Sequence, residues 1–289
     1  MYYNYIILSV LMFGGCFLIK DIYRKKRNTT DIIMTFESMF IGSLAGLFVL
    51  FIINGFKFEF TFFTFIMVLL TTLNNLAFTY CSFKALKSIN LSVFSLFTML
   101  GGMLLPFFQG ILFYNEGITL GKILCVILIG FSLLLTIKKG EKKSGYIYYL
   151  GIFILNGLSG VLANLFSEAT FEKTSAAGYS ILLAIVSIIV SFIALVIIYL
   201  SKKEQLTKPN LSSTTLCITN GILDKVANYL LVFALLYVDA SIQYPMVTGG
   251  VMIVSTISSF LMGIKPSKKE VVAVLIAFIA MLVLFFVPI

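Results

Sequence analysis

The sequence predicts an all-α integral membrane protein whose ten transmembrane helices form two inverted five-helix repeats. Hydrophobic residues make up 60% of the 289 residues and charged residues only 11%, whereas charged residues account for about 25% of a typical soluble domain. The apolar residues gather in segments that reach the length of about 20 residues needed to cross the hydrocarbon of a bilayer. Polar residues inside two of these segments repeat with the same spacing in both halves of the chain.

The apolar segments follow one another with short connections that leave no room for a separate soluble domain. In order, they cover residues 2–20, 32–55, 60–83, 90–113, 119–137, 146–168, 175–200, 211–237, 240–263 and 270–288. Basic residues follow the first segment and do not precede it, so this segment is interpreted as a retained helix and not as a signal peptide.

The basic residues favour every second connection of the chain. Most of the 21 Lys and Arg residues follow odd-numbered segments: Lys20, Arg24, Lys25, Lys26, Arg27, Lys84, Lys87, Lys138, Lys139, Lys142, Lys143, Lys202, Lys203, Lys208, Lys265, Lys268 and Lys269. The even-numbered connections hold only Lys57, Lys122 and Lys173. Because cytoplasmic loops carry such an excess, the pattern predicts a multi-pass protein of the cell membrane, a bacterial inner or plasma membrane, with both termini outside. Topology thus accounts for the net charge of +9, and no nucleic-acid partner is expected.

An internal repeat divides the chain into a first five-helix repeat, residues 1–143, and a second, residues 144–289. When residues 71–135 are set over residues 220–284, three polar residues at spacings of four coincide. They are Thr71, Asn75 and Thr79 in the first half and Asn220, Asp224 and Asn228 in the second. Each half holds an odd number of segments, so the second half enters the membrane from the opposite face. Inverted repeats of this kind occur in many secondary transporters, with the binding site near the midplane at the repeat interface.

Segment 211–237 contains two full charges, Asp224 and Lys225, near its middle. A charged residue at the centre of a bilayer costs roughly 2.5 to 3.5 kcal/mol, and such residues normally face a cavity on a substrate or ion pathway. Asn220, Asp224 and Asn228 share one helix face, because residues four apart lie above one another. Asp224 is therefore the main candidate for substrate recognition or for coupling to a proton, with Asn220 and Asn228 beside it.

Segment 60–83 carries a second polar stripe, formed by Thr72, Asn75, Thr79 and Ser82. Both stripes are expected to face the protein interior, since a polar side chain in lipid lacks a partner. Two interpretations of their amides and hydroxyls remain open. They either hold helices together by hydrogen bonds, at about 0.6 to 2 kcal/mol each, or line a binding cavity, and Asn75 and Thr79 are the residues expected to line it.

Lys225, Glu37 and Tyr229 complete the set of candidate binding residues. Lys225 points about 100° away from Asp224 around the helix, so it can form an ion pair with Glu37 on another helix or stay with Asp224. Glu37 can instead extend to the membrane surface. Tyr229 lies near the polar stripe and either offers its ring to a cation or fills the interior, and the same alternatives hold for Tyr80 and Tyr244.

Small residues gather in other segments at positions typical of close helix packing. They are Asn156, Gly157, Ser159, Gly160 and Asn164 in segment 146–168, the pair Gly101-Gly102 and the pair Gly249-Gly250.

The chain lacks the residues that other membrane machineries need. It contains no His and no G-x-x-x-x-G-K-[ST] loop, which excludes His-ligated metals and ATP as the motor. Its four Cys residues are widely spaced and are interpreted as structural thiols. No Ser/His or Glu/His pair is available for an intramembrane protease. We therefore expect neither an enzyme nor a bound cofactor.

Motifs at the helix junctions resemble the EamA-type repeat of the drug/metabolite transporter superfamily. In the first half these are the stretches from Phe13 to Lys20, Ala85 to Ser92 and Phe113 to Thr119, followed by Gly121. In the second half they are the stretches from Ala234 to Ser241 and Gly263 to Ser267, followed by an apolar helix from Val271. The resemblance implies a ten-helix carrier with a central cavity lined by both halves, in a superfamily that moves amino acids, nucleotide sugars, choline-like cations and drugs.

Residues and resemblance together predict a secondary active transporter that moves a small polar or cationic metabolite or drug by alternating access. A proton or solute gradient would drive it, and the protein would act as a monomer or homodimer among membrane lipids. The alternative is a flippase for a lipid-linked sugar, or an accessory membrane subunit, in which Asp224 is structural.

Overall fold

The computed structural model describes residues 2–28, 31–113, 119–136, 143–201, 210–238, 240–263 and 267–286. These residues form helices and short turns, without a strand among them. The helices are α1 (Tyr2–Arg27), α2 (Ile32–Ile53), α3 (Phe62–Leu86), α4 (Leu91–Phe113), α5 (Leu120–Thr136), α6 (Lys143–Glu168), α7 (Ala176–Ser201), α8 (Leu211–Ala234), α9 (Ala240–Leu261) and α10 (Lys268–Phe286).

Seven stretches of helix in the described part of the chain are long and apolar enough to cross a membrane: α1 to α4, α7, α8 and residues 146–168 of α6. An α-helix is the only open element that satisfies all its backbone hydrogen bonds in lipid. The prediction of an all-helical membrane protein is therefore confirmed at this level.

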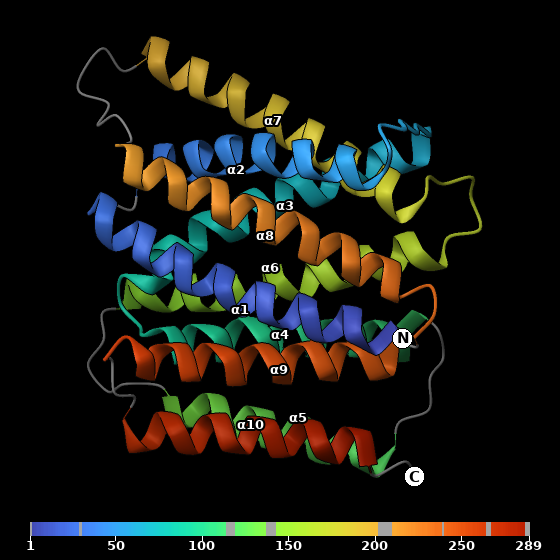
Figure 1. Ribbon diagram of the computed structural model, residues 1–289. Helices are drawn as coiled ribbons and strands as arrows, with labels where there is room; N and C mark the ends of the chain where they lie inside the picture. Colours follow the sequence, from blue (N-terminus) through green and yellow to red (C-terminus); the bar gives the residue numbers. More distant parts are fainter. Residues whose placement is uncertain are drawn as a thin grey trace.

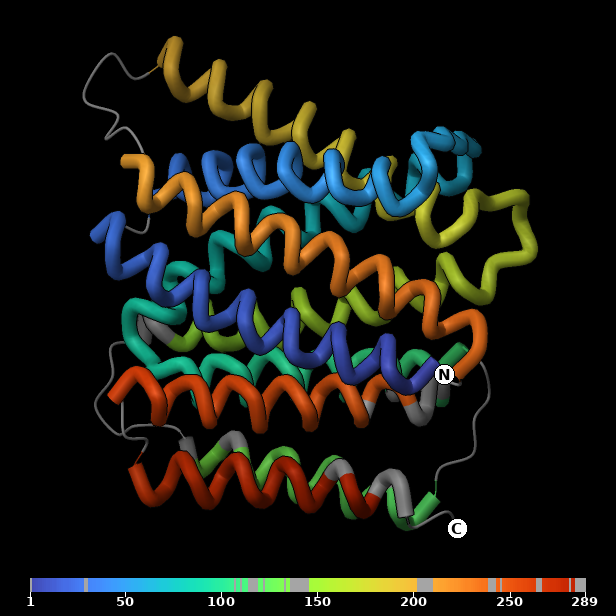
Figure 2. Tube along the Cα trace, viewed as in Figure 1, coloured from blue at the N-terminus to red at the C-terminus, as the bar shows by residue number. Residues whose placement is uncertain are grey.

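The helices lie side by side and successive helices run in opposite directions, with both termini at the same end of the molecule (Figure 1). α1 packs against α8 and α9, and α2 packs against α7 and α8. α3 contacts α6 and α7, while α4 contacts α6 and α9. α5 and α10 form a pair at one side of the bundle, as the tube in Figure 2 shows.

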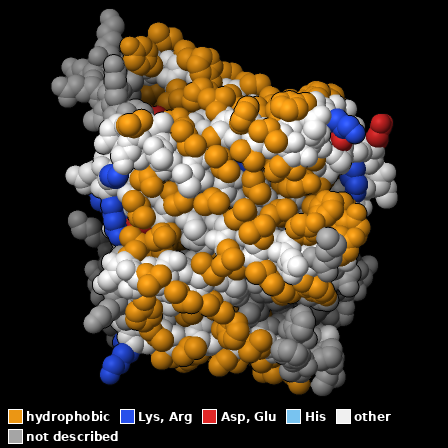
Figure 3. All heavy atoms as spheres, viewed as in Figure 1, with side chains coloured by type: hydrophobic (Ala, Val, Ile, Leu, Met, Phe, Trp, Pro, Cys, Tyr) orange, Lys and Arg blue, Asp and Glu red, His pale blue; other side chains and the backbone are white. Residues whose placement is uncertain are grey.

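Charged residues concentrate at the two ends of the bundle and leave an apolar belt between them. Figure 3 shows several Lys and Arg side chains along the left edge, where α1, α3 and α9 end, and a mixed basic and acidic group at the upper right. The predicted basic connections are only partly visible, since Lys138, Lys139, Lys142, Lys202, Lys203, Lys208 and Lys265 lie outside the described residues.

The first helix is longer than the predicted segment 2–20, because α1 continues to Arg27. Its last turns carry an ion-pair network in which Asp21, only 3% exposed, contacts the Arg24 guanidinium at 2.8 Å and the Lys25 ammonium at 2.7 Å. Carboxylate and basic residues three and four apart share a helix face and neutralise one another. Lys20 therefore lies inside a helix and not in a connection.

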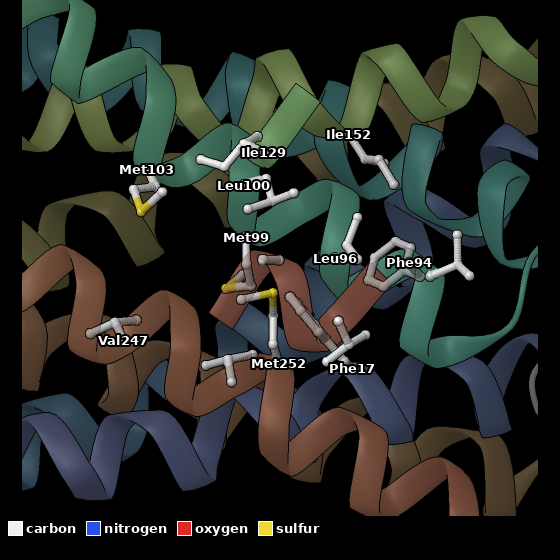
Figure 4. Packing of buried hydrophobic residues seen from close by; sticks show 14 of the residues in the cluster. Phe17, Phe94, Leu96, Met99, Leu100, Met103, Ile129, Ile152, Val247 and Met252 are labelled. Atoms are coloured by element: carbon white, nitrogen blue, oxygen red, sulfur yellow. The ribbon is translucent and has the colours of Figure 1, made fainter. Parts of the chain in front are cut away.

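The main apolar core lies between α1, α4 and α9 and reaches toward the α5 and α10 pair. Figure 4 shows Met99 of α4 beside Met252 of α9, with Phe17 and Phe94 packed edge to face, their ring centroids 5.0 Å apart. Flexible Met side chains fill irregular gaps between helices. This core forms one wall of the polar cavity described below.

Glycines allow two pairs of helices to approach at backbone distance. A methyl group on Gly101 of α4 would overlap with the carbonyl of Phe153 in α6, and one on Gly221 of α8 would overlap with the backbone of Gly42 in α2. Small residues at such crossings are typical of helix packing in membranes. The predicted packing role is confirmed for Gly101 and also for Gly157, where an added Cβ would lie 2.5 Å from the Gly101 carbonyl oxygen.

Candidate functional site

A cavity of about 240 Å³ lies in the middle of the bundle, between α1, α2, α3, α4, α6, α7, α8 and α9. The two polar triplets of the repeat analysis both line it. They are Thr71, Asn75 and Thr79 on α3 and Asn220, Asp224 and Asn228 on α8. The structure thus brings together residues that lie far apart in the sequence, and four of the predicted binding residues, Asn75, Thr79, Asn220 and Asn228, line the same cavity as Asp224.

Asp224 and Lys225 place opposite charges against the cavity. The Asp224 side chain is 32% exposed and that of Lys225 only 8%. The Lys225 ammonium lies 3.8 Å from Asp224 Oδ2, which is longer than a hydrogen bond. The stem of Lys225 packs over Gly46 of α2, where an added Cβ would lie 2.5 Å from Lys225 Cγ. The missing side chain at Gly46 therefore makes room for the lysine.

Lys20 of α1 is a third charged residue at the cavity and was not predicted as a site residue. It is only 9% exposed, lines the cavity and holds its ammonium 5.1 Å from the centre of the Phe78 ring. From the sequence it is counted among the basic residues that follow the first segment. Its helical spacing from Phe13 and Cys16, which also line the cavity, is the signal that places it on the inner face of α1.

Side-chain amides surround the charged residues. Asn228 Nδ2 donates to the Asp224 backbone carbonyl at 2.8 Å, and Gln243 Nε2 donates to the Leu231 carbonyl at 2.9 Å. The amide oxygens of Asn220 and Gln243 are buried and accept no hydrogen bond from the described residues. Buried polar atoms are normally paired, so these two oxygens are available to a donor that enters the cavity.

Two of the predicted binding residues, Glu37 and Tyr229, lie away from the cavity lining. Glu37 Oε2 contacts the Arg27 guanidinium at 2.6 Å, because the extension of α1 brings that group to the start of α2. The suggested ion pair between Glu37 and Lys225 is therefore absent. Tyr229 packs instead against the small cluster that contains Leu50 and Ile181.

The predicted polar stripe on α3 meets the cavity only in part, since Asn75 and Thr79 line it and Thr72 and Ser82 do not. Thr71 lines it, whereas Thr72 is buried elsewhere and Ser82 donates to the Phe78 carbonyl of its own helix at 2.7 Å. Asn74, which the sequence interpretation left aside, holds α3 to α6 by donating to the Leu155 carbonyl at 2.9 Å and to Ser159 Oγ at 2.7 Å. The helix-linking and cavity-lining roles thus fall to neighbouring residues.

Two apolar clusters border the cavity toward opposite ends of the bundle. Tyr23 and Phe83, with Cys217, gather where α1 and α3 end and α8 begins. Phe166 and Tyr179 meet at 4.4 Å between ring centroids where α6 ends and α7 begins. Tyr23, Phe83 and Tyr179 also line the cavity, so an aromatic group stands between the polar site and each end.

The described residues contain no group of three or more Cys, Asp or Glu side chains arranged to hold a metal ion. The four Cys residues are free thiols, and Cys16, Cys125 and Cys217 are buried. Cys16 lies against the cavity and its Sγ donates weakly to the Asn220 carbonyl at 3.6 Å.

Comparison with known proteins identifies the fold and nothing finer. No family model matches the chain, and no curated protein matches it. Among solved structures, a crystal structure of a protein is similar with a TM-score of 0.63 and 15% sequence identity, covering 96% of this chain and 95% of the other. The likeness extends over nearly the whole chain, so this arrangement of helices is shared with an experimentally determined protein.

Proposed function

We propose that this protein is a secondary active carrier that moves a small polar solute across the membrane by alternating access. The observation that carries the proposal is the convergence of the Asn75 and Asp224 triplets, one from each half of the chain, on one cavity with Lys225. Ionisable residues inside a membrane protein typically mark a substrate or ion path. Asp224 would act as the main recognition or coupling group, and Asn75, Thr79, Asn220 and Asn228 would line the path.

The helix contacts support the proposal of two inverted repeats, residues 1–143 and 144–289. In two five-helix repeats, α1 corresponds to α6, α3 to α8 and α4 to α9. The contact of α1 with α8 then corresponds to that of α6 with α3, and the contact of α1 with α9 to that of α6 with α4. All four of these pairs are in contact, and α1 and α6 run in opposite directions in Figure 1. Ten membrane spans would follow, as in the EamA-type carriers that the sequence resembles. The distribution of basic residues favours both termini outside, whereas members of that family usually keep them in the cytoplasm.

Alternating access requires a barrier on each side of the site that can open in turn. The Tyr23 and Phe83 cluster and the Phe166 and Tyr179 cluster are suited to this role, since they lie at opposite ends of the bundle and border the cavity. If the two repeats exchange their conformations, one cluster would open while the other stays packed.

Uptake into liposomes that contain the purified protein tests the proposal. The panel is labelled glutamate, choline, glucose and uridine, offered with and without a proton gradient, and at least one solute should enter faster than in protein-free liposomes. Asp224→Asn should lower that rate roughly tenfold or more, because it removes a charged hydrogen-bonding partner from the site. Glu172→Gln is the matched control, since it removes a carboxylate from an exposed position away from the cavity.

Full transport by a well-folded Asp224→Asn protein would refute the role of Asp224. Failure to move any solute of the panel would refute the carrier in this form and favour the lipid-handling alternative, which liposomes with a labelled polyprenyl phosphate sugar would then test.

A further inference from the structure

The charges at the cavity do not balance. Among the described residues that line it, the Lys, Arg, Asp and Glu residues are Lys20, Asp224 and Lys225, so two ammonium groups share one carboxylate. Lys20 and Lys225 both line the cavity, and they belong to α1 and α8, which pack together. The site therefore carries an excess of positive charge in the middle of an apolar bundle.

Neither ammonium group has a hydrogen-bond acceptor within the described part of the chain. Lys225 reaches Asp224 only at 3.8 Å, and Lys20 contacts the Phe78 ring face. Two carboxylates on α1 and α2 form ion pairs with other residues. Asp21 pairs with Arg24 and Lys25, and Glu37 pairs with Arg27. A buried charge is costly unless it is paired and hydrogen-bonded, so an anion that enters the cavity would stabilise both lysines.

We propose that the cavity binds a small organic oxyanion, a carboxylate or phosphate group seated against Lys20 and Lys225, whose own hydroxyl or ammonium donors meet Asp224 and the free amide oxygens of Asn220 and Gln243. This inference rests on the proposed carrier function and narrows its substrate class. It replaces the expected cationic solute, because a cation would add to the excess of positive charge that two lysines and one carboxylate already give the lining.

Such a solute carries chemical groups that match both the lysines and the acceptors of the lining. Ammonium groups and oxyanions form short, charge-assisted hydrogen bonds, which are about twice as strong as neutral ones. Asp224 and the two unpaired amide oxygens are acceptors, so they require donors on the remainder of the solute. An amino acid with an acidic side chain, a hydroxy acid or a polyol phosphate offers both ends, and the cavity of about 240 Å³ suits a solute of that size.

Thermal unfolding of the detergent-purified protein provides the binding test, with a fluorogenic thiol dye as the probe. The dye is suitable because Cys16, Cys125 and Cys217 are buried in the folded protein and become reactive on unfolding. The ligands are offered as matched pairs that differ in charge: glutamate with glutamine, and glycerol 3-phosphate with glycerol. Choline serves as the cation. At least one anion should raise the unfolding temperature, while its neutral partner and choline should not.

Variants assign the effect to the lysines. Lys20→Gln and Lys225→Gln should each weaken the apparent Kd for the stabilising anion roughly 10- to 100-fold, and Lys20→Arg should retain more of the affinity than Lys20→Gln. Lys84→Gln is the matched control: Lys84 also lies over an aromatic ring, that of Tyr80 at 5.5 Å, but it does not line the cavity. Its affinity should equal that of the wild type.

The inference is overturned if choline alone stabilises the protein, if no ligand of the set does, or if Lys20→Gln binds the anion as the wild type does. If one of these results is obtained but the liposomes take up a cation or a neutral solute, the carrier proposal still holds. If the liposomes take up no solute at all, both the carrier proposal and the oxyanion site are refuted. A short-chain phosphatidic acid, tested beside glycerol 3-phosphate, separates two sources of phosphate. Stabilisation by the lipid alone would keep the oxyanion site and assign its ligand to a headgroup.

Discussion

At the scale of single residues, Lys20 carries a charge that no carboxylate of the described chain neutralises. Its ammonium is held over the Phe78 ring, and a cation over an aromatic face gains less than it loses by leaving water when no anion is present. The residue is therefore expected to serve binding at the expense of stability.

Replacing Lys20 by Met should stabilise the ligand-free protein, because Met keeps the apolar contacts of the stem and removes the unpaired charge. The expected gain in unfolding free energy is about 1 kcal/mol or more, seen as a higher unfolding temperature in the thiol-dye assay without added ligand. A lower unfolding temperature than that of the wild type would show that Lys20 has a partner that stabilises it. The same substitution at Lys84 is the control.

The predicted site residues differ in how clearly the sequence marks them. Asp224 was identifiable because a carboxylate stands out in the middle of an apolar segment. Lys20 was not, since it stands at the edge of the segment and is followed by Arg24, so a long helix and a short one fit the same pattern. Of the two alternatives for Glu37, the ion pair with Lys225 does not form, because Arg27 at the end of the extended α1 pairs with Glu37. Helix periodicity does not reveal this extension of α1.

At the scale of helices, the crossing of α2 and α8 depends on glycine at two contacting positions. Gly42 and Gly221 meet backbone to backbone, and one turn further along α2 Gly46 accommodates the stem of Lys225. This crossing fixes how far α8 stands from α2 and hence how Lys225 reaches the cavity.

Gly221→Ala should destabilise the protein by about 1 to 3 kcal/mol, because the new methyl group overlaps with the backbone of Gly42 and no flexible side chain can yield. Thermal unfolding measures the loss. Gly130→Ala on α5 is the matched control, since a Cβ there meets no atom within 4 Å and alanine favours a helix over glycine by about 1 kcal/mol. Equal stabilities of the two variants would contradict the close α2–α8 crossing.

Helix type and the long apolar segments were predictable because the signal extends over some 20 residues of each segment. Finer features were less so. Asn75 and Thr79 of the predicted α3 stripe line the cavity, but Thr71 of the repeated triplet lines it in place of Thr72. Thr71 and Thr72 are both polar, and a single residue turns the face by about 100°. Neighbouring helices decide which of the two meets the cavity.

At the scale of the whole molecule, the described Lys and Arg residues gather mainly at one end of the bundle (Figure 3). An excess of basic residues is typical of the cytoplasmic side, so this end is proposed to face the cytoplasm and both termini the outside. The ten spans, their inverted repeat and their orientation stay predictions that depend on how the chain enters a membrane.

Labelling of single cysteines should reveal the orientation. Glu172→Cys, at the exposed turn between α6 and α7, should react with a membrane-impermeant maleimide in intact cells. Lys87→Cys, at the exposed turn after α3, should react only after permeabilisation. Wild-type protein is the background control, because three of its four thiols are buried and Cys81 is partly covered. The reverse pattern would place the termini in the cytoplasm and invert the proposed topology.

The α5 and α10 pair has a consequence for how proteins of this architecture can diversify. The two helices pack mainly on each other, and none of their described residues lines the cavity. If the cavity binds a solute as we propose, substitutions of its described lining fall on the other eight helices and leave this pair unchanged. Residues such as Lys20 and Asp224 can therefore change during evolution while the packing of α5 and α10 at one side of the bundle is retained.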